Sequence, residues 1–76
     1  MVIKILGTGC AKCKKLAENA QQAVTEMGIE AVIEKVEKLE DIMNYGVMKT
    51  PALVIDEQVK VMGRVPSPAD IKKYLA

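Results

Sequence analysis

The chain has 76 residues, half of them apolar and only two of them aromatic, which predicts one small domain with an aliphatic core. Its formal net charge of +1 and its shortage of aromatic side chains for stacking argue against a nucleic acid or an anionic membrane as partner. There is no histidine, which excludes Ser-His and Cys-His mechanisms and every zinc site that uses a histidine ligand.

The first half of the chain predicts a strand, a loop and a long amphipathic helix. The apolar run Val2–Leu6 has the pattern of a strand and is too short for a signal peptide, so we expect a cytoplasmic protein. The helix that follows should end at Gly28, where a left-handed cap is expected. Its inward stripe comprises Leu16, Ala17, Ala20, Val24 and Met27. Its polar outer face comprises Lys14, Lys15, Glu18, Asn19, Gln21, Gln22 and Glu26.

The second half predicts two further helices and three strands. In chain order we expect a strand over Ile29–Val36, a short helix over Lys38–Tyr45, a connector ending at Pro51, a strand covered on both faces over Ala52–Ile55, a turn over Asp56–Gln58, a hairpin strand over Val59–Met62 and a helix that begins at Pro68 with Ser67 as its N-cap. The methionines Met27, Met43, Met48 and Met62 are expected to fill gaps in the core, with Met48 the one that could be exposed near a site.

The resulting order is βαβαββα in a single α/β domain over residues 1–76, without linker or repeat. The two βα units predict parallel pairing, and the hairpin predicts an antiparallel edge. We therefore expect a four-stranded mixed sheet with helices on both faces.

Cys10 and Cys13 are the only cysteines, and they form a C-x-x-C motif where the strand and loop lead into the first helix. A helix N-terminus stabilises a thiolate through its unpaired N–H groups and its dipole, and the thiolate is the form that attacks disulfides. In a reducing compartment such a pair is more often catalytic or metal-binding than structural. Two buried thiols and half of a zinc site are the alternatives, but a tetrahedral zinc site needs four ligands, so we expect no bound metal.

A second motif precedes the third predicted strand: Tyr45-Gly46-Val47-Met48-Lys49-Thr50-Pro51-Ala52-Leu53. Together with Gly9-Cys10-Ala11-Lys12-Cys13 and the element order, it resembles the thioredoxin-like superfamily over essentially the whole chain. Within that superfamily the chain is most similar to the minimal, glutaredoxin-sized "redox-active disulfide" small thioredoxin-like proteins. The resemblance implies a thiol–disulfide oxidoreductase that reduces disulfides of protein or small-molecule partners and needs no cofactor.

The resemblance also implies roles for individual residues. Cys10 would be the nucleophile, and Cys13 would be the buried thiol that resolves the mixed disulfide. A cis peptide bond would precede Pro51, and Thr50 would offer backbone groups to an extended substrate. Lys12, inside the motif, is either part of an ordinary solvated helix face or a group that favours the Cys10 thiolate and steers acidic partners.

Three departures from the superfamily pattern concern the partners. Thr8 and Gly9 stand where larger thioredoxins have a tryptophan, Lys4 stands where they bury an acidic residue, and only Gly63 remains of the Gly-Gly pair with which glutaredoxins bind glutathione. Because the Gly-Gly pair is missing, we expect a thioredoxin-reductase-type flavoprotein as electron donor. We also expect a monomer. The alternative function is a soft-metal module for Cu(I) or zinc of the heavy-metal-associated type, which also places C-x-x-C between a strand and a helix.

Overall fold

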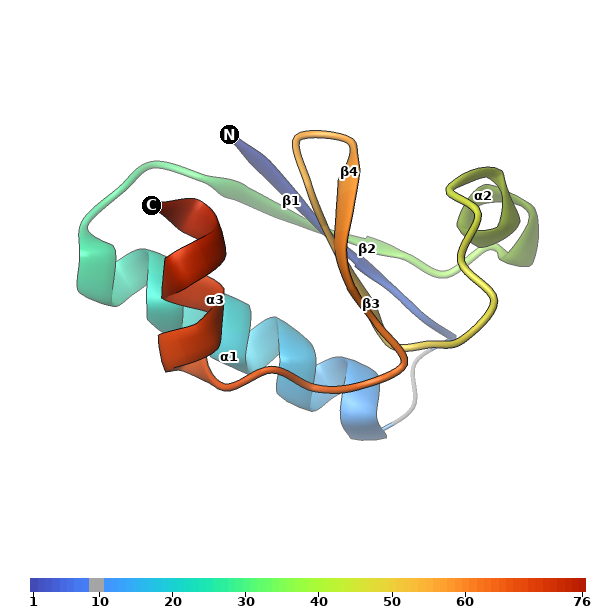
Figure 1. Ribbon diagram of the computed structural model, residues 1–76, viewed down its shortest axis with the longest axis horizontal. Helices are drawn as coiled ribbons and strands as arrows, with labels where there is room; N and C mark the ends of the chain where they lie inside the picture. The colour runs from blue at the N-terminus through green and yellow to red at the C-terminus, as the bar shows by residue number, and fades with distance from the viewer. Residues whose placement is uncertain (9–10) are drawn as a thin grey trace.

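The computed structural model describes residues 1–8 and 11–76, which form four strands and three helices in the predicted order. The elements are β1 (Val2–Leu6), α1 (Ala11–Met27), β2 (Val32–Val36), α2 (Leu39–Asn44), β3 (Ala52–Ile55), β4 (Gln58–Met62) and α3 (Pro68–Leu75). Figure 1 shows α1 and α3 lying together on one side of the sheet, with α2 standing apart from them. The expected α/β fold with a four-stranded mixed sheet and helices on both faces is confirmed.

The strands lie in the order β2-β1-β3-β4. β1 pairs with β2 in parallel, whereas β3 runs antiparallel to both β1 and β4. The prediction of parallel pairing for both βα units is therefore wrong for the second unit. A parallel return must carry the chain back along the length of the sheet, usually on an α-helix. The six residues of α2 rise only about 9 Å, so β3 starts at the end of the sheet where β2 stopped.

α1 presents an apolar face to the sheet and to α3, as its periodicity predicts, and Gly28 ends it with a positive φ of 64°. Asn19, however, is buried rather than on the outer face. Its Nδ2 donates a hydrogen bond of 3.0 Å to the carbonyl oxygen of Pro66 in the segment that leads into α3. That segment covers a side of α1 which the helix periodicity alone assigns to solvent.

The larger core lies between the sheet and the pair α1 and α3. Its buried members among the described residues are Ile3, Ile5, Leu16, Ala20, Ala23, Val24, Leu53, Ile55, Val61, Ile71 and Leu75. β3 is buried along its whole length, as its continuous apolar run predicts, because it is a central strand covered on both faces. The helix start of α3 is also as predicted, since Ser67 Oγ accepts a hydrogen bond of 3.2 Å from the backbone N–H of Asp70.

The opposite face has a smaller core, made of Leu6, Ile42, Val47, Ala52 and Val54. Only Ile42 of α2 is buried, and Met43 is 64% exposed. Met62 is 49% exposed, so the expectation that the methionines fill the core is wrong for Met43 and Met62, whereas Met48, the one that could be exposed, is 93% exposed. A helix of six residues can turn only one narrow side toward the sheet, and the rest of its apolar side chains remain in solvent.

The tight hairpin between β3 and β4 has Asp56 and Glu57 as its two loop residues, with Ile55 opposite Gln58. Both loop residues have positive φ, 47° and 68°, which non-glycine residues adopt at a cost. Two hydrogen bonds to β1 offset that cost: Asp56 N–H donates to the Val2 carbonyl, and Asp56 Oδ1 accepts from Val2 N–H, each at 2.9 Å. The start of β1 at Val2 also explains why β2 begins at Val32 and not, as expected from the sequence, at Ile29. Val32 pairs with Val2, and β1 has no residue to pair with the positions before Val32.

Candidate functional site

The site is built at the end of β1, where Gly7 meets the first turn of α1. Gly7 continues the sheet for one residue, since its N–H donates a 2.9 Å hydrogen bond to the Val36 carbonyl. Cys13 is buried, with 6% of its surface exposed. A β-carbon at residue 7 would overlap the Cys13 sulfur and would lie 3.3 Å from Cys13 Cβ. Residue 7 is therefore a glycine because the sulfur occupies the space of its side chain. Cys10, the expected nucleophile, lies outside the described residues.

The loop that ends at Pro51 approaches the same point. The Thr50–Pro51 peptide bond is cis, and Thr50 Cβ would be 3.8 Å from a β-carbon at residue 7. Thr50 is exposed, whereas Pro51 is buried and its carbonyl oxygen accepts a 2.9 Å hydrogen bond from Gly63 N–H. The structure thus brings the second cysteine of the C-x-x-C motif and the Thr-Pro motif together, although 37 positions separate Cys13 from Thr50 in the chain.

Lys12 belongs to the first turn of α1 and is exposed. Lys14 and Lys15 are also exposed there, and this turn has no acidic residue. Lysines oppose the helix dipole at this end. The charges of these lysines and the partial charges of the helix N–H groups are both positive, so together they favour an anion at the start of α1.

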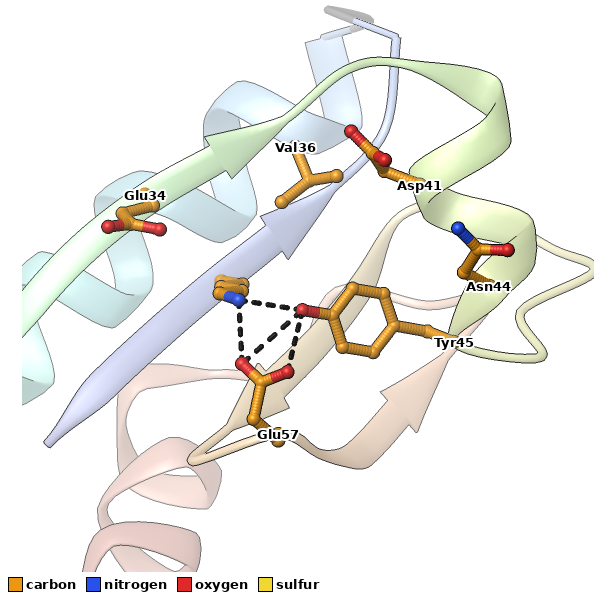
Figure 2. A pocket seen from close by; sticks show the side chains of 7 residues that line it. Glu34, Val36, Asp41, Asn44, Tyr45 and Glu57 are labelled. Atoms are coloured by element: carbon orange, nitrogen blue, oxygen red, sulfur yellow. Dashed lines mark hydrogen bonds and ion pairs between the residues drawn. The ribbon is translucent and has the colours of Figure 1, made fainter.

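A hydrogen-bonded cluster of Lys4, Tyr45 and Glu57 lies on the α2 side of the sheet, and sequence reasoning did not find it. Lys4 Nζ donates to Tyr45 Oη at 2.7 Å and pairs with Glu57 Oε1 at 2.6 Å, while Tyr45 Oη lies 3.0 Å from Glu57 Oε2. Figure 2 shows the Tyr45 hydroxyl and the Glu57 carboxylate facing each other. The cluster borders an open pocket of about 500 Å³, which Glu34, Val36, Asp41 and Asn44 also line.

The charges in this cluster stabilise one another. The hydrogen bond from Lys4, and to a smaller extent the one from Tyr45, holds the pKa of Glu57 below its ordinary value. The hydrogen bond to Glu57, and to a smaller extent the one to Tyr45, raises the pKa of Lys4 above its ordinary value. The one available signal was a lysine in an otherwise apolar strand, because a buried-strand lysine needs partners. The partners themselves are the C-cap residue of α2 and a residue of the hairpin loop, and they leave no local pattern.

The cluster is separate from the cysteine motif. Lys4 faces the α2 side of the sheet, whereas Ile3 and Ile5 on either side of it belong to the core under α1. Lys4 occupies the strand position at which larger thioredoxins bury an acidic residue, and here its ammonium group is bound to Glu57 and Tyr45. Of the residues that the structure describes, no group of three metal-ligating side chains is arranged to hold an ion. No helix in that part of the chain is long and apolar enough to cross a membrane.

Comparison with known proteins agrees with this architecture. The model of the thioredoxin domain family matches residues 1–76. This chain belongs to the thioredoxin family. It is 46% identical over 76 residues to a thioredoxin of Methanothermobacter thermautotrophicus, covering 100% of this chain and 99% of that protein. It is 41% identical over 75 residues to a thioredoxin of Methanocaldococcus jannaschii, covering 99% of this chain and 86% of that protein.

Family membership decides between the two classes of function that the sequence left open. The chain is a thiol–disulfide oxidoreductase, as its resemblance to thioredoxins implied. The soft-metal module is not favoured.

Proposed function

We propose that the chain reduces disulfides of protein or small-molecule partners by cycling Cys10 and Cys13 between dithiol and disulfide. The observation that carries this proposal is the position of Cys13, whose sulfur is buried against Gly7 with Thr50 beside it. A shielded second thiol suits a two-step exchange, in which Cys10 attacks the substrate disulfide first and Cys13 attacks the mixed disulfide afterwards.

In the first step the Cys10 thiolate attacks a substrate disulfide. Its electron pair forms the new bond between Cys10 and one substrate sulfur, and the other substrate sulfur leaves as a thiolate and takes up a proton. In the second step the Cys13 thiolate attacks the Cys10 sulfur, which releases the remaining substrate thiolate and leaves a Cys10–Cys13 disulfide. Two electrons pass from the protein to the substrate.

We assign substrate positioning to the surface around this pair. Thr50 is exposed beside the buried Pro51, so its backbone groups are available to an extended segment of a partner. Lys12 adds positive charge at the start of α1, which favours the Cys10 thiolate and acidic partners.

The oxidised protein needs a donor of two electrons, and we propose a thioredoxin-reductase-type flavoprotein acting on a monomer in the cytoplasm. Of the Gly-Gly pair used for glutathione, only Gly63 is present, and its N–H is taken by the Pro51 carbonyl. Turnover with glutathione and none with any thioredoxin reductase would contradict this choice of donor.

The roles of the two cysteines are tested with Cys10→Ser and Cys13→Ser. The Cys13→Ser variant should still attack disulfides and should accumulate a stable mixed disulfide, because no second thiol remains. The Cys10→Ser variant should react slowly with disulfides and with iodoacetamide near neutral pH, because Cys13 is buried. Alkylation rates and mass spectrometry of trapped adducts provide the measurement.

The double variant, with both cysteines replaced by serine, gives the background for reaction at other groups. Equal alkylation rates for the two single variants, or adducts trapped on Cys13, would reverse the assignment. No mixed disulfide on either variant would refute the proposed cycle.

A further inference from the structure

A small cavity of about 70 Å³ adjoins the buried side chain of Cys13. It is lined by Ile5, Gly7, Cys13, Lys14, Lys35 and Glu37. A water molecule needs roughly 10–15 Å³ of such space and two or more polar partners. The cavity therefore has both the room and the charged groups to hold more than one water beside the sulfur.

The parallel pairing of β1 and β2 determines which groups line this cavity. Lys35 is the partner of Ile5, and the bond from Gly7 N–H to the Val36 carbonyl places the following residue, Glu37, next to Gly7. Lys35 and Glu37 are two residues apart along the chain, and both line the α1 side of the sheet. Glu37 is thus the carboxylate that the sheet brings beside the glycine on which the Cys13 sulfur packs.

The second step of the proposed cycle creates a need that this cavity meets. Cys13 must lose a proton before it attacks, because the thiolate is the nucleophile. Only 6% of its surface is exposed, so direct transfer of the proton to bulk solvent is hindered. Glu37, Lys14 and Lys35 are themselves exposed, so the cavity connects the sulfur with groups that exchange protons freely with solvent.

We propose that Glu37 accepts the Cys13 proton through water in this cavity, while Lys14 and Lys35 stabilise the thiolate that forms. This inference rests on the proposed function. The proton moves from the Cys13 thiol to water and from water to the Glu37 carboxylate. The electron pair left on the Cys13 sulfur forms the bond to Cys10, and the substrate sulfur leaves Cys10 with the pair of the broken bond. Glu37 then returns its proton to solvent.

A purely electrostatic role for Glu37 would have the opposite consequence. A carboxylate near the sulfur repels a thiolate, so replacing it with a neutral amide would favour the thiolate and accelerate the second step. If Glu37 is the proton acceptor, in contrast, its removal should slow the second step. The sign of the effect therefore separates the two roles.

The test is the reaction of the reduced protein with dithiobis(nitrobenzoate). Attack by Cys10 releases one equivalent of thionitrobenzoate, and resolution by Cys13 releases a second, so the two steps appear as two phases of absorbance. Glu37→Gln should slow the second phase by about tenfold or more and leave the first within about twofold, since general base catalysis contributes at least that much. Glu37→Asp should retain part of the rate, and added acetate should restore part of it in Glu37→Gln.

The matched control is Glu34→Gln. Glu34 lies on β2, three residues before Glu37, but lines the pocket on the other face of the sheet, so its variant should show both phases unchanged. An unchanged or faster second phase in Glu37→Gln, or a slow one that neither aspartate nor acetate relieves, would overturn the inference. A wild-type protein that releases only the first equivalent would instead overturn the proposed function on which it rests.

Discussion

The two faces of the sheet are packed to different degrees. On the face under α1 and α3, eleven buried apolar side chains of the described residues form one core. On the face under α2 there are five, and the centre of that face holds the Lys4, Tyr45 and Glu57 cluster and an open pocket. Leu39 and Met43 of α2 remain 64% exposed.

The proposed redox site lies on the densely packed face. Cys13 is on α1, one turn before Leu16, and its sulfur lies against the end of β1. A close-packed core transmits small displacements because it has few voids to absorb them. We therefore expect substitutions on the α1 face to change both stability and thiol reactivity, whereas substitutions on the α2 face should leave the thiols unaffected.

The largest contrast is expected from the same substitution on the two faces. Leu16 is 0% exposed, so Leu16→Ala should lower the free energy of unfolding by about 3 kcal/mol, through lost burial and the cavity left behind. Leu39→Ala, its control on exposed α2, should stay within about 0.5 kcal/mol of wild type. Urea unfolding measures both. Equal losses in the two variants would contradict the difference between the faces.

A smaller but more local effect is expected at Gly7. In Gly7→Ala the new methyl group overlaps the Cys13 sulfur, and such overpacking costs about 2 kcal/mol. The displaced sulfur should also react faster with iodoacetamide when measured in a Cys10→Ser background.

Gly28→Ala is the control for the backbone alone. Its β-carbon would meet nothing within 4 Å, and its cost comes only from a positive φ of 64°. It should lower stability by about 1 kcal/mol and leave Cys13 reactivity unchanged. An unchanged Cys13 rate in Gly7→Ala would show that the sulfur is not held by this contact.

The smallest effect is expected on the α2 face and depends on pH. The pKa of Glu57 is lowered in the folded state by Lys4 and then Tyr45. Its contribution to stability is therefore present above the ordinary glutamate pKa of about 4.3 and is lost as the pH falls through the lower folded value. Glu57→Gln lacks that titration, so its stability should fall less steeply than wild type below about pH 4.3. The Glu57 side chain is 65% exposed, so the difference should be small and should shrink in high salt.

The measurement is urea unfolding of both proteins over a series of acidic pH values. Parallel curves would mean that the Lys4–Glu57 pair contributes nothing to folding in solution. The same pair titrates again at alkaline pH: the pKa of Lys4 is raised, so its contribution is present at neutral pH and is lost as the pH rises through the folded value.

Features written in short stretches of sequence could be predicted. The element order follows from apolar periodicity, the burial of β3 from its unbroken apolar run, and the ends of α1 and α3 from Gly28 and Ser67. The family followed from two short motifs, and through it so did the thiol–disulfide chemistry. Each of these leaves a pattern in residues that are near one another in the chain. The roles of Cys10 and Cys13 remain predictions.

What the sequence could not give are contacts between distant segments. The burial of Asn19 depends on a carbonyl 47 residues away, and the Lys4 cluster joins residues 41 and 53 positions from it. The antiparallel direction of β3 depends on where β2 ends relative to β1. The need for glycine at residue 7 arises only when α1 packs the Cys13 sulfur onto the end of β1. Such contacts leave no periodicity or local motif, because their partners are brought together only by the packing of helices against the sheet.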